Sequence, residues 1–206
     1  MRTTQLIVSL VFVVHSWPAA AEIGPREVVE QANNRIHKLV SQNAREGTPQ
    51  AAERDRQLKA VVTELLDLDF MAQDALGRTW DERTPAERQE YLSLMRQLVE
   101  RSYLRQARSR VQYTMTVRDV TIDQASGRAE VETVLVVTTH GRREEVEVEY
   151  DMALREGRWR VIDVQTDGAS TVRNYRAQFR RIIQQDGFGE LLARLRSRLE
   201  AGESDI

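Results

Sequence analysis

Residues 157–179 restrict the possible folds of this chain more than any other stretch, because a predicted strand there leads directly into a predicted helix. The strand, at 159–165, carries apolar side chains on both faces. After a tight turn at 167–168, the hydroxyl of Ser170 is suited to accept a free backbone N–H at the start of a helix. Apolar residues then recur with helical spacing from 172 to 182. We therefore expect a sheet layer and a helix layer to meet here.

The apolar pattern changes from a period of 3.6 to a period of 2 at Gln112, which predicts three more strands before the one at 159–165. They are expected at 112–122, 128–139 and 145–154, and the short turns between them contain glycine. Such turns indicate an antiparallel meander of four strands. The third strand has one acidic face, whereas the second and fourth are apolar on both faces. We expect a strongly curved sheet whose concave face is partly covered by helices.

Helices are predicted before the sheet. Pro25 suits the first position of a helix with an apolar stripe, and Gly, Thr and Pro at 47–49 end that pattern. A second helix is expected at about 50–67. Asp69 is then expected to cap a short helical turn at 70–76.

A longer helix is predicted to begin at Thr84, where Pro85 and Glu87 complete a capping box, and to run to about residue 109. Its apolar stripe is broader than that of an ordinary surface helix, which indicates packing on two sides. After the sheet, Gly187 separates the helix that starts at Ser170 from a last amphipathic helix.

These elements predict an α+β fold, in which a curved four-stranded antiparallel sheet packs with helices and an N-terminal helical subdomain is added. We expect a helical part at 22–110 and a part at 111–206 that holds the sheet and the C-terminal helices. The two parts are expected to form one unit.

The first 21 residues have the features of a cleavable signal peptide. Arg2 provides the positive charge, 6–14 form an uncharged apolar run, and Ala19 to Ala21 precede Glu22 as a cleavage site. The apolar run is about half the ~20 residues that a spanning helix needs. We therefore expect secretion, with a bacterial periplasm as the destination.

The composition excludes several kinds of chemistry. The chain has no Cys, so disulfides, thiolate metal sites and thiol catalysis are excluded. Beyond the signal peptide it has two His: His37 is expected on the solvated side of the first helix, and His140 at a hairpin tip. Neither has a metal-binding spacing. The formal net charge of −2 gives no argument for nucleic-acid binding.

Two acidic features remain as candidates. The carboxylates Glu145, Glu147 and Glu149 are interpreted as a solvated face, because alternate residues of one strand spread apart rather than converge on a metal. Asp163 is predicted on the same strand face as Trp159 and Val161 and would point inward. It has two interpretations, a proton-transfer base or a structural acid that accepts bonds from backbone donors or an Arg near the turn.

Arginines lie beside the aromatic stripe of the helix that follows Ser170. Arg173, Arg176 and Arg180 recur with helical spacing next to Tyr175 and Phe179. They form either a solvated, salt-bridged face or a rim that binds an anion such as phosphate. Aromatic side chains next to such a row of arginines would suit a ligand with an apolar part and an anionic group, such as a phospholipid.

Taken in order along the chain, several short motifs resemble the MlaC family, also called the toluene-tolerance family, of periplasmic phospholipid-binding proteins. They are Leu68-Asp69-Phe70-Met71, Leu76-Gly77 with Trp80, Tyr150, Gly157-x-Trp159-x-Val161-x-Asp163-Val164, Gly168-x-Ser170, Tyr175-Arg176-x-Gln178-Phe179, and Gly187 followed by Leu191-Leu192-x-x-Leu195. Their order and spacing cover essentially the whole chain beyond the signal peptide.

The resemblance implies a sheet of the NTF2-like type with a helical subdomain, enclosing lipid tails in an apolar pocket. Members are periplasmic carriers between an inner-membrane ABC transporter with an MCE-domain protein and an outer-membrane lipoprotein–porin complex, which maintain outer-membrane lipid asymmetry. A related branch is associated with hopanoid biosynthesis, so a hopanoid is an alternative ligand. A carrier of this kind is most simply a monomer that needs no cofactor.

As a hypothesis, the pocket wall and its rim use residues of the sheet and of the helices next to it. Arg176 and Arg180 are expected at the headgroup or at a docking surface. The predicted wall consists of Tyr103, Leu135, Val137, Tyr150, Met152, Trp159, Val161, Tyr175 and Phe179.

Two other functions stay open. One is an NTF2-like enzyme with Asp163 as base, which requires that carboxylate inside a small pocket with a hydrogen-bond donor opposite. The other is a structural adaptor, which requires a solid core without a cavity.

Overall fold

The structure of the chain is a computed structural model that describes residues 23–42, 44–108, 112–139 and 142–202. The predicted signal peptide and the hairpin tip with His140 lie outside these residues. In chain order the described elements are α1 (Pro25–Val40), α2 (Pro49–Leu65), α3 (Leu68–Leu76), the 3₁₀ helix η1 (Gly77–Trp80), α4 (Pro85–Arg108), β1 (Gln112–Asp123), β2 (Arg128–Thr139), β3 (Arg142–Arg155), β4 (Arg158–Thr166), β5 (Ala169–Ser170), α5 (Thr171–Asp186) and α6 (Phe188–Ala201).

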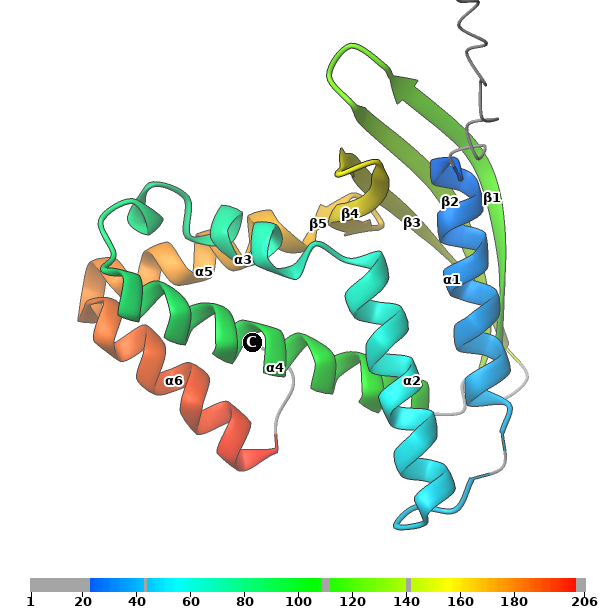
Figure 1. Cartoon of the computed structure of the whole chain (residues 1–206), viewed down its shortest axis with the longest axis horizontal. Coiled ribbons are helices and arrows are strands. Elements are labelled where there is room, and N and C mark those ends of the chain that lie inside the picture. The colour runs from blue at the N-terminus through cyan, green and yellow to red at the C-terminus, as the bar shows by residue number, and fades with distance from the viewer. Residues whose placement is uncertain (1–22, 43, 109–111, 140–141, 203–206) are drawn as a thin grey trace, which may run out of the picture.

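The helices form two groups beside one sheet (Figure 1). The helix α1 packs against β1 and β2, and α2 packs against α1. The helices α3 to α6 form the second group, in which α5 packs against α3 and α6, and α4 against α6. The helix α4 also contacts α1 and α2, so it joins the two groups.

Two of the predicted helix caps are confirmed. The N–H of Glu87 donates to the Thr84 hydroxyl at 3.3 Å, and the N–H of Thr84 donates to the Glu87 carboxylate at 2.8 Å. At the start of α5, the Ser170 hydroxyl accepts the N–H of Arg173 at 3.0 Å. Both caps satisfy N–H groups that have no partner inside their own helix.

The sheet is antiparallel and its strands follow one another in the order β1-β2-β3-β4-β5. It thus has five strands where the sequence predicted four. The extra strand, β5, has only two residues, Ala169 and Ser170, which pair with the end of β4. Because Ser170 is also the N-cap of α5, this pairing fixes where the helix leaves the sheet.

A β-bulge in β4 changes the predicted faces of that strand. Asp163 lies opposite Asp151, whereas Val161 lies opposite Met152, so Ile162 is an additional residue between the two pairs. The prediction that Val161 and Asp163 share a face is therefore wrong. Asp163 lies on the outer face of the sheet with Asp151, and Val161 on the face that the helices cover.

The carboxylate of Asp163 caps α5. Its Oδ1 accepts the N–H of Val172 at 3.0 Å and the N–H of Val164 at 2.8 Å, and the Ser170 hydroxyl donates to its Oδ2. A negative charge at this end of a helix is also favourable for the helix dipole. The contacts of Asp163 correspond to the structural interpretation of this acid.

The segment between α2 and α3 is bound to β4. The N–H of Asp67 donates to the carbonyl of Val161 at 2.8 Å, and the Arg160 guanidinium donates to the carbonyls of Thr63 and Leu66 at the end of α2. Asp67 also caps α3, because its carboxylate accepts the N–H of Phe70 at 3.2 Å.

The prediction that Asp69 caps this helix is wrong, because Asp69 lies inside α3 and forms an ion pair with Arg96 of α4 at 2.6 Å.

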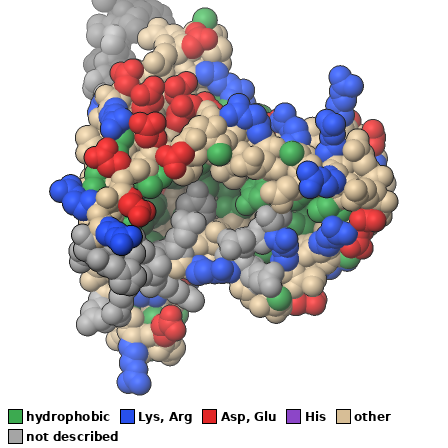
Figure 2. Space-filling view, turned by 180° about the vertical axis from the view of Figure 1, so that it is seen from behind, with side chains coloured by type: hydrophobic (Ala, Val, Ile, Leu, Met, Phe, Trp, Pro, Cys, Tyr) green, Lys and Arg blue, Asp and Glu red, His purple; other side chains and the backbone are tan. Residues whose placement is uncertain are grey.

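Acidic side chains gather on the outer face of the sheet, which lies on the left of Figure 2. Glu130 lies directly opposite Asp151, and Glu132 directly opposite Glu149. Burial and then the repulsion by Glu130, Asp151 and Glu132 raise the pKa of Glu149. Burial and the neighbouring Asp163 likewise raise the pKa of Asp151. Like charges at directly opposite positions destabilise a sheet.

Asp163→Ala should lower the free energy of unfolding by about 1–3 kcal/mol, since it leaves the N–H of Val172 without its acceptor. Urea denaturation measures this change. Asn174→Ala, at an exposed position of the same helix, is the control and should stay within about 0.5 kcal/mol of the parent. An equal effect of the two substitutions would contradict the capping role.

Glu149→Gln should raise the free energy of unfolding at neutral pH by about 0.2–1 kcal/mol, because it removes a carboxylate from a repulsive pair. A raised pKa means that the folded protein keeps protons that the unfolded chain has lost, so stability falls as the pH rises through the interval between the two pKa values. The gain should disappear below about pH 4, where carboxyl groups are protonated.

Thermal unfolding at both pH values measures the effect of Glu149→Gln. Glu53→Gln is the control for which the free energy of unfolding at neutral pH should change in the opposite direction. The hydrogen bond and charge of Arg56 lower the pKa of Glu53, so its charged form is favoured in the folded protein. A Glu149→Gln protein that is less stable than the parent at neutral pH would contradict the repulsion argument.

Candidate functional site

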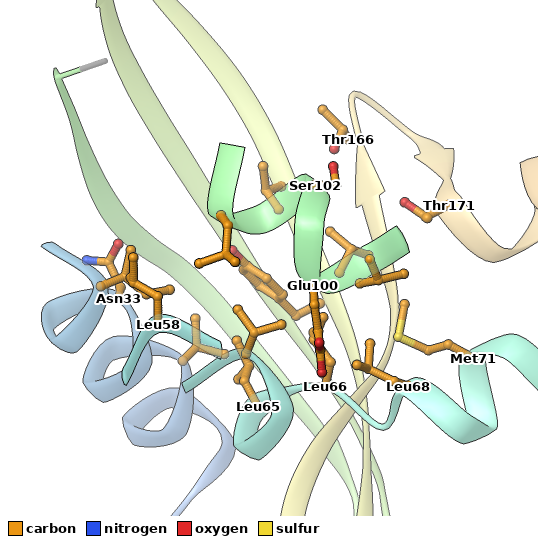
Figure 3. Close-up of a pocket in the computed structure, with 18 of the residues that line it drawn as sticks. Asn33, Leu58, Leu65, Leu66, Leu68, Met71, Glu100, Ser102, Thr166 and Thr171 are labelled. Atoms are coloured by element: carbon orange, nitrogen blue, oxygen red, sulfur yellow. The ribbon is translucent and has the colours of Figure 1, made fainter. Parts of the chain in front are cut away.

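A cavity of about 670 Å³ lies between the inner face of the sheet and the helices (Figure 3). Side chains from α1 to α5 and from β1 to β4 form its wall, and most of them are aliphatic. The lining residues are Val29, Asn33, Ile36 and Val40 of α1, Leu58, Lys59, Val62 and Leu65 of α2, Leu66 after it, Leu68, Met71 and Ala72 of α3, Met95, Val99, Glu100, Ser102 and Leu104 of α4, Tyr113 and Met115 of β1, Leu135 and Val137 of β2, Val146, Val148 and Tyr150 of β3, Val164 and Thr166 of β4, and Thr171, Val172 and Tyr175 of α5.

The helix α4 separates the cavity from the helical core. Tyr91 and Leu98 are fully buried among the helices α3 to α6, where the Tyr91 hydroxyl donates to the carbonyl of Ala72 at 2.9 Å. Val99 and Leu104 of the same helix face the cavity. The broad apolar stripe of this helix therefore serves two surfaces, as its width in the sequence indicated.

One polar contact of the wall joins α1 to β1. The Tyr113 hydroxyl donates to the side-chain oxygen of Asn33 at 3.1 Å, and the Tyr113 ring lies 4.4 Å from the ring of His37. Burial raises the pKa of Tyr113, so the phenol remains a neutral donor at ordinary pH. His37 is half-buried against this ring, so the prediction that it is simply solvated is wrong.

A second polar contact joins α2 to α4. The ammonium nitrogen of Lys59 lies 2.6 Å from a carboxylate oxygen of Glu100. The Glu100 side chain is only 13% exposed, whereas that of Lys59 is 46% exposed. The pair therefore has an inner carboxylate and an outer ammonium group, at a place where the cavity wall meets solvent.

Four residues of the predicted wall line this cavity: Leu135, Val137, Tyr150 and Tyr175. They come from β2, β3 and α5, so two adjacent strands of the sheet and the helix after the sheet contribute to the same cavity. The side chain of Tyr103 lies outside what the structure describes.

The other predicted wall residues lie outside the lining. Met152 and Val161 are fully buried under the segment between α2 and α3, and Trp159 packs against the same cluster. The bridge between Leu66 and Val161 covers that end of the sheet, which is why the cavity stops before it. Phe179 belongs to the helical core, where its ring meets Tyr91 edge-on at 6.1 Å.

The two predicted rim arginines do not line the cavity either. Arg176 binds Asp74 of α3, with a guanidinium nitrogen 2.6 Å from the carboxylate and a second bond of 2.9 Å to the Asp74 carbonyl. Arg180 is exposed one turn further along α5. Arg176 therefore fastens α5 to α3, which is the salt-bridged interpretation of this helix face.

Apart from Tyr175, the described helix residues that line the cavity are not among the predicted site residues. These residues, among them Val29, Leu58 and Val99, were recognised only as apolar stripes, because the same spacing is typical of a filled core. Lys59 and Glu100 gave no signal, since charged residues on amphipathic helices are usually solvated.

The acid that the sequence offered as a possible base, Asp163, lies away from the cavity. Asp163 is not among its lining residues, and both of its oxygens are bound at the start of α5. Glu130, Glu149 and Asp151 bring carboxylate oxygens within 4.8 Å of one another, because Glu130 of β2 lies opposite Asp151 of β3. This cluster lies on the outer face of the sheet, away from the cavity. From the sequence, a metal site was considered only for the carboxylates of one strand, Glu145, Glu147 and Glu149. Among the described residues, no helix combines the length and apolar character that crossing a membrane requires.

Comparison with known proteins agrees with this geometry. A sequence comparison with curated proteins gives no match. Among solved structures, the chain is similar to the phospholipid-binding protein from Ralstonia solanacearum, which was solved in complex with a phospholipid. The TM-score is 0.69 at 21% sequence identity, and the alignment covers 85% of this chain and 96% of the other, so the two share a fold. The family model described as MlaC protein matches residues 30–197, and the chain therefore belongs to the MlaC family.

Proposed function

We propose that this protein is a periplasmic carrier that holds the acyl chains of a phospholipid in its cavity and moves lipid between the inner and outer membranes. The observation that carries the proposal is the 670 Å³ cavity with a largely aliphatic wall. Membership of the MlaC family, and a shared fold with a protein solved with bound phospholipid, support it.

The volume of the cavity suits acyl chains. A dry cavity of about 150 Å³ holds one benzene molecule, which corresponds to roughly 25 Å³ per carbon atom. At that packing, 670 Å³ accommodates about 27 carbon atoms, or most of two 16-carbon chains. Because burying one CH₂ group contributes about 0.8 kcal/mol, two such chains exposed to water would cost about 25 kcal/mol. A carrier with this cavity removes most of that cost.

The wider role follows from the family and from the predicted signal peptide. We propose that the carrier exchanges lipid with an inner-membrane ABC transporter that has an MCE-domain protein, and with an outer-membrane lipoprotein–porin complex. This exchange would maintain outer-membrane lipid asymmetry, and it needs no cofactor and no second copy of the chain. We also propose that the sheet is of the NTF2-like type, and that 22–110 and 111–206 act as one lipid-binding unit.

The enzyme alternative is less well supported. It needs Asp163 inside the pocket with a free oxygen, whereas the carboxylate caps α5 on the outer side of the bulged strand. A structural adaptor is not favoured either, since it needs no cavity. A hopanoid in place of a phospholipid would use the same apolar wall, and extraction of the bound lipid decides between the two.

Protein purified without detergent from its source organism should contain close to one equivalent of lipid, which solvent extraction and mass spectrometry identify. Folded protein that carries no lipid and takes none up from liposomes would overturn the carrier proposal. A hopanoid in the extract would replace the phospholipid as the ligand.

Leu135→Trp should reduce the bound lipid about tenfold or more, because the larger side chain on β2 occupies space that the acyl chains need. The same substitution should leave the free energy of unfolding unchanged or raise it by about 0.5–2 kcal/mol, as cavity-filling substitutions do. Lipid per protein after extraction and thermal unfolding measure the two effects.

Val136→Trp is the matched control, since the adjacent residue of β2 points to the opposite face of the sheet. It should leave lipid loading unchanged. Equal loading of the Leu135→Trp protein and the parent would show that the chains bind elsewhere.

A further inference from the structure

The pair Lys59–Glu100 is unusual for its place in the molecule. Of the described residues that line the cavity, these two alone carry a full charge. They come from α2 and α4, and their charged atoms are 2.6 Å apart. The rest of the nearby wall is apolar: Leu58, Val62 and Val99 are sequence neighbours or one-turn neighbours of the pair on the same two helices.

The two partners differ in how free they are to move. Glu100 projects from α4 toward the side of the cavity where Leu65 and Leu66 lie (Figure 3), and it is 13% exposed. Lys59 is 46% exposed and carries its charge on a long flexible chain. A ligand at the cavity can therefore draw the ammonium group away, whereas the carboxylate stays on the wall.

We propose that this pair selects lipids whose headgroup is zwitterionic, with the phosphate bound by Lys59 and the headgroup cation bound by Glu100. The inference rests on the proposed function, because it presupposes that the acyl chains occupy the cavity. It adds a ligand class and two specificity-determining residues.

The selectivity follows from the charge of Glu100. A phosphate that binds Lys59 takes away the counter-ion of a carboxylate in a region of low dielectric constant, where an unpaired charge is costly. A headgroup with an ammonium or choline cation replaces that counter-ion. An anionic lipid without a cation leaves Glu100 unpaired or must share Lys59 with it. The pair thus discriminates by penalising the wrong headgroup as well as by binding the right one.

Lipid uptake from vesicles tests the proposal. Delipidated full-length mature protein is incubated with vesicles that contain equal amounts of phosphatidylethanolamine and phosphatidylglycerol with identical acyl chains, and bound lipid is extracted and quantified by mass spectrometry. The parent protein should take up the zwitterionic lipid in about tenfold or greater excess, in keeping with the cost of an uncompensated charge in an interface. Phosphatidylcholine in place of phosphatidylethanolamine should give the same preference.

Substitutions of the two partners should shift this ratio in opposite directions. Glu100→Gln removes the charge that needs a cation, so the preference should fall to about one while total loading is retained. Lys59→Met keeps an apolar stem but leaves Glu100 without its counter-ion, so the preference for the zwitterionic lipid should rise further. If Lys59→Met does not fold, Lys59→Gln takes its place with the same expected direction.

Asp69→Asn is the matched control, because Asp69 pairs with Arg96 of α4 over the same 2.6 Å and neither residue lines the cavity. It should leave the lipid ratio unchanged. If Glu100→Gln and Lys59→Met change only the thermal stability, the pair only stabilises the packing of α2 on α4, and the proposal is overturned. Loaded parent protein without a headgroup preference overturns it as well, while the carrier function stands. A failure to take up any lipid overturns the carrier function and this inference together.

Discussion

The strand β4 binds elements of both groups of helices. Its Val161 carbonyl accepts the N–H of Asp67, which fixes the passage from α2 to α3. Two residues later, the carboxylate of Asp163 accepts the N–H of Val172 and fixes the start of α5. The bulge at Ile162 lies between these two contacts and places the side chain of Val161 on the helix-covered face and that of Asp163 on the outer face. One short stretch of one strand thus bonds to segments at the ends of three helices, α2, α3 and α5.

These two hydrogen bonds, from Asp67 to Val161 and from Val172 to Asp163, hold the helices near one edge of the sheet. The inner face further along the strands is therefore left open as a cavity. The bridge between Leu66 and Val161 closes one end of the inner face, and α1 covers β1 and β2. The wall between them is largely aliphatic, with side chains such as Leu135 and Val148. The outer face carries the opposite chemistry, since carboxylates such as Glu130, Glu149 and Asp151 gather there.

Much of the local structure could be predicted from the sequence. The capping box at Thr84 and the N-cap at Ser170 depend on residues three positions apart, and the strands follow from a period of 2 over long segments. The acidic face of β3 is also a local pattern. These features are encoded within a few residues of where they occur.

Features that depend on distant contacts could not be predicted. The residues around Ile162 fit a regular strand equally well, so no local signal marks the bulge. Asp67 and Asp69 are both suitable caps for α3, and the bond from Asp67 to β4 decides between them. The cavity itself had no signature, because an apolar stripe that lines a pocket has the same spacing as one that fills a core. Only the family resemblance pointed to it.

The energetics of lipid exchange give the few polar residues of the wall more weight than their number suggests. When a lipid leaves a bilayer for this cavity, its chains pass from one apolar environment to another, so the large hydrophobic contributions to the two bound states nearly cancel. The remaining difference comes from contacts that the bilayer does not offer in the same form. In the described wall such contacts include the hydrogen bond between Tyr113 and Asn33 and the ion pair between Lys59 and Glu100. On the proposed function, the aliphatic wall provides the affinity for acyl chains, and the preference among headgroups depends on polar contacts such as the ion pair between Lys59 and Glu100.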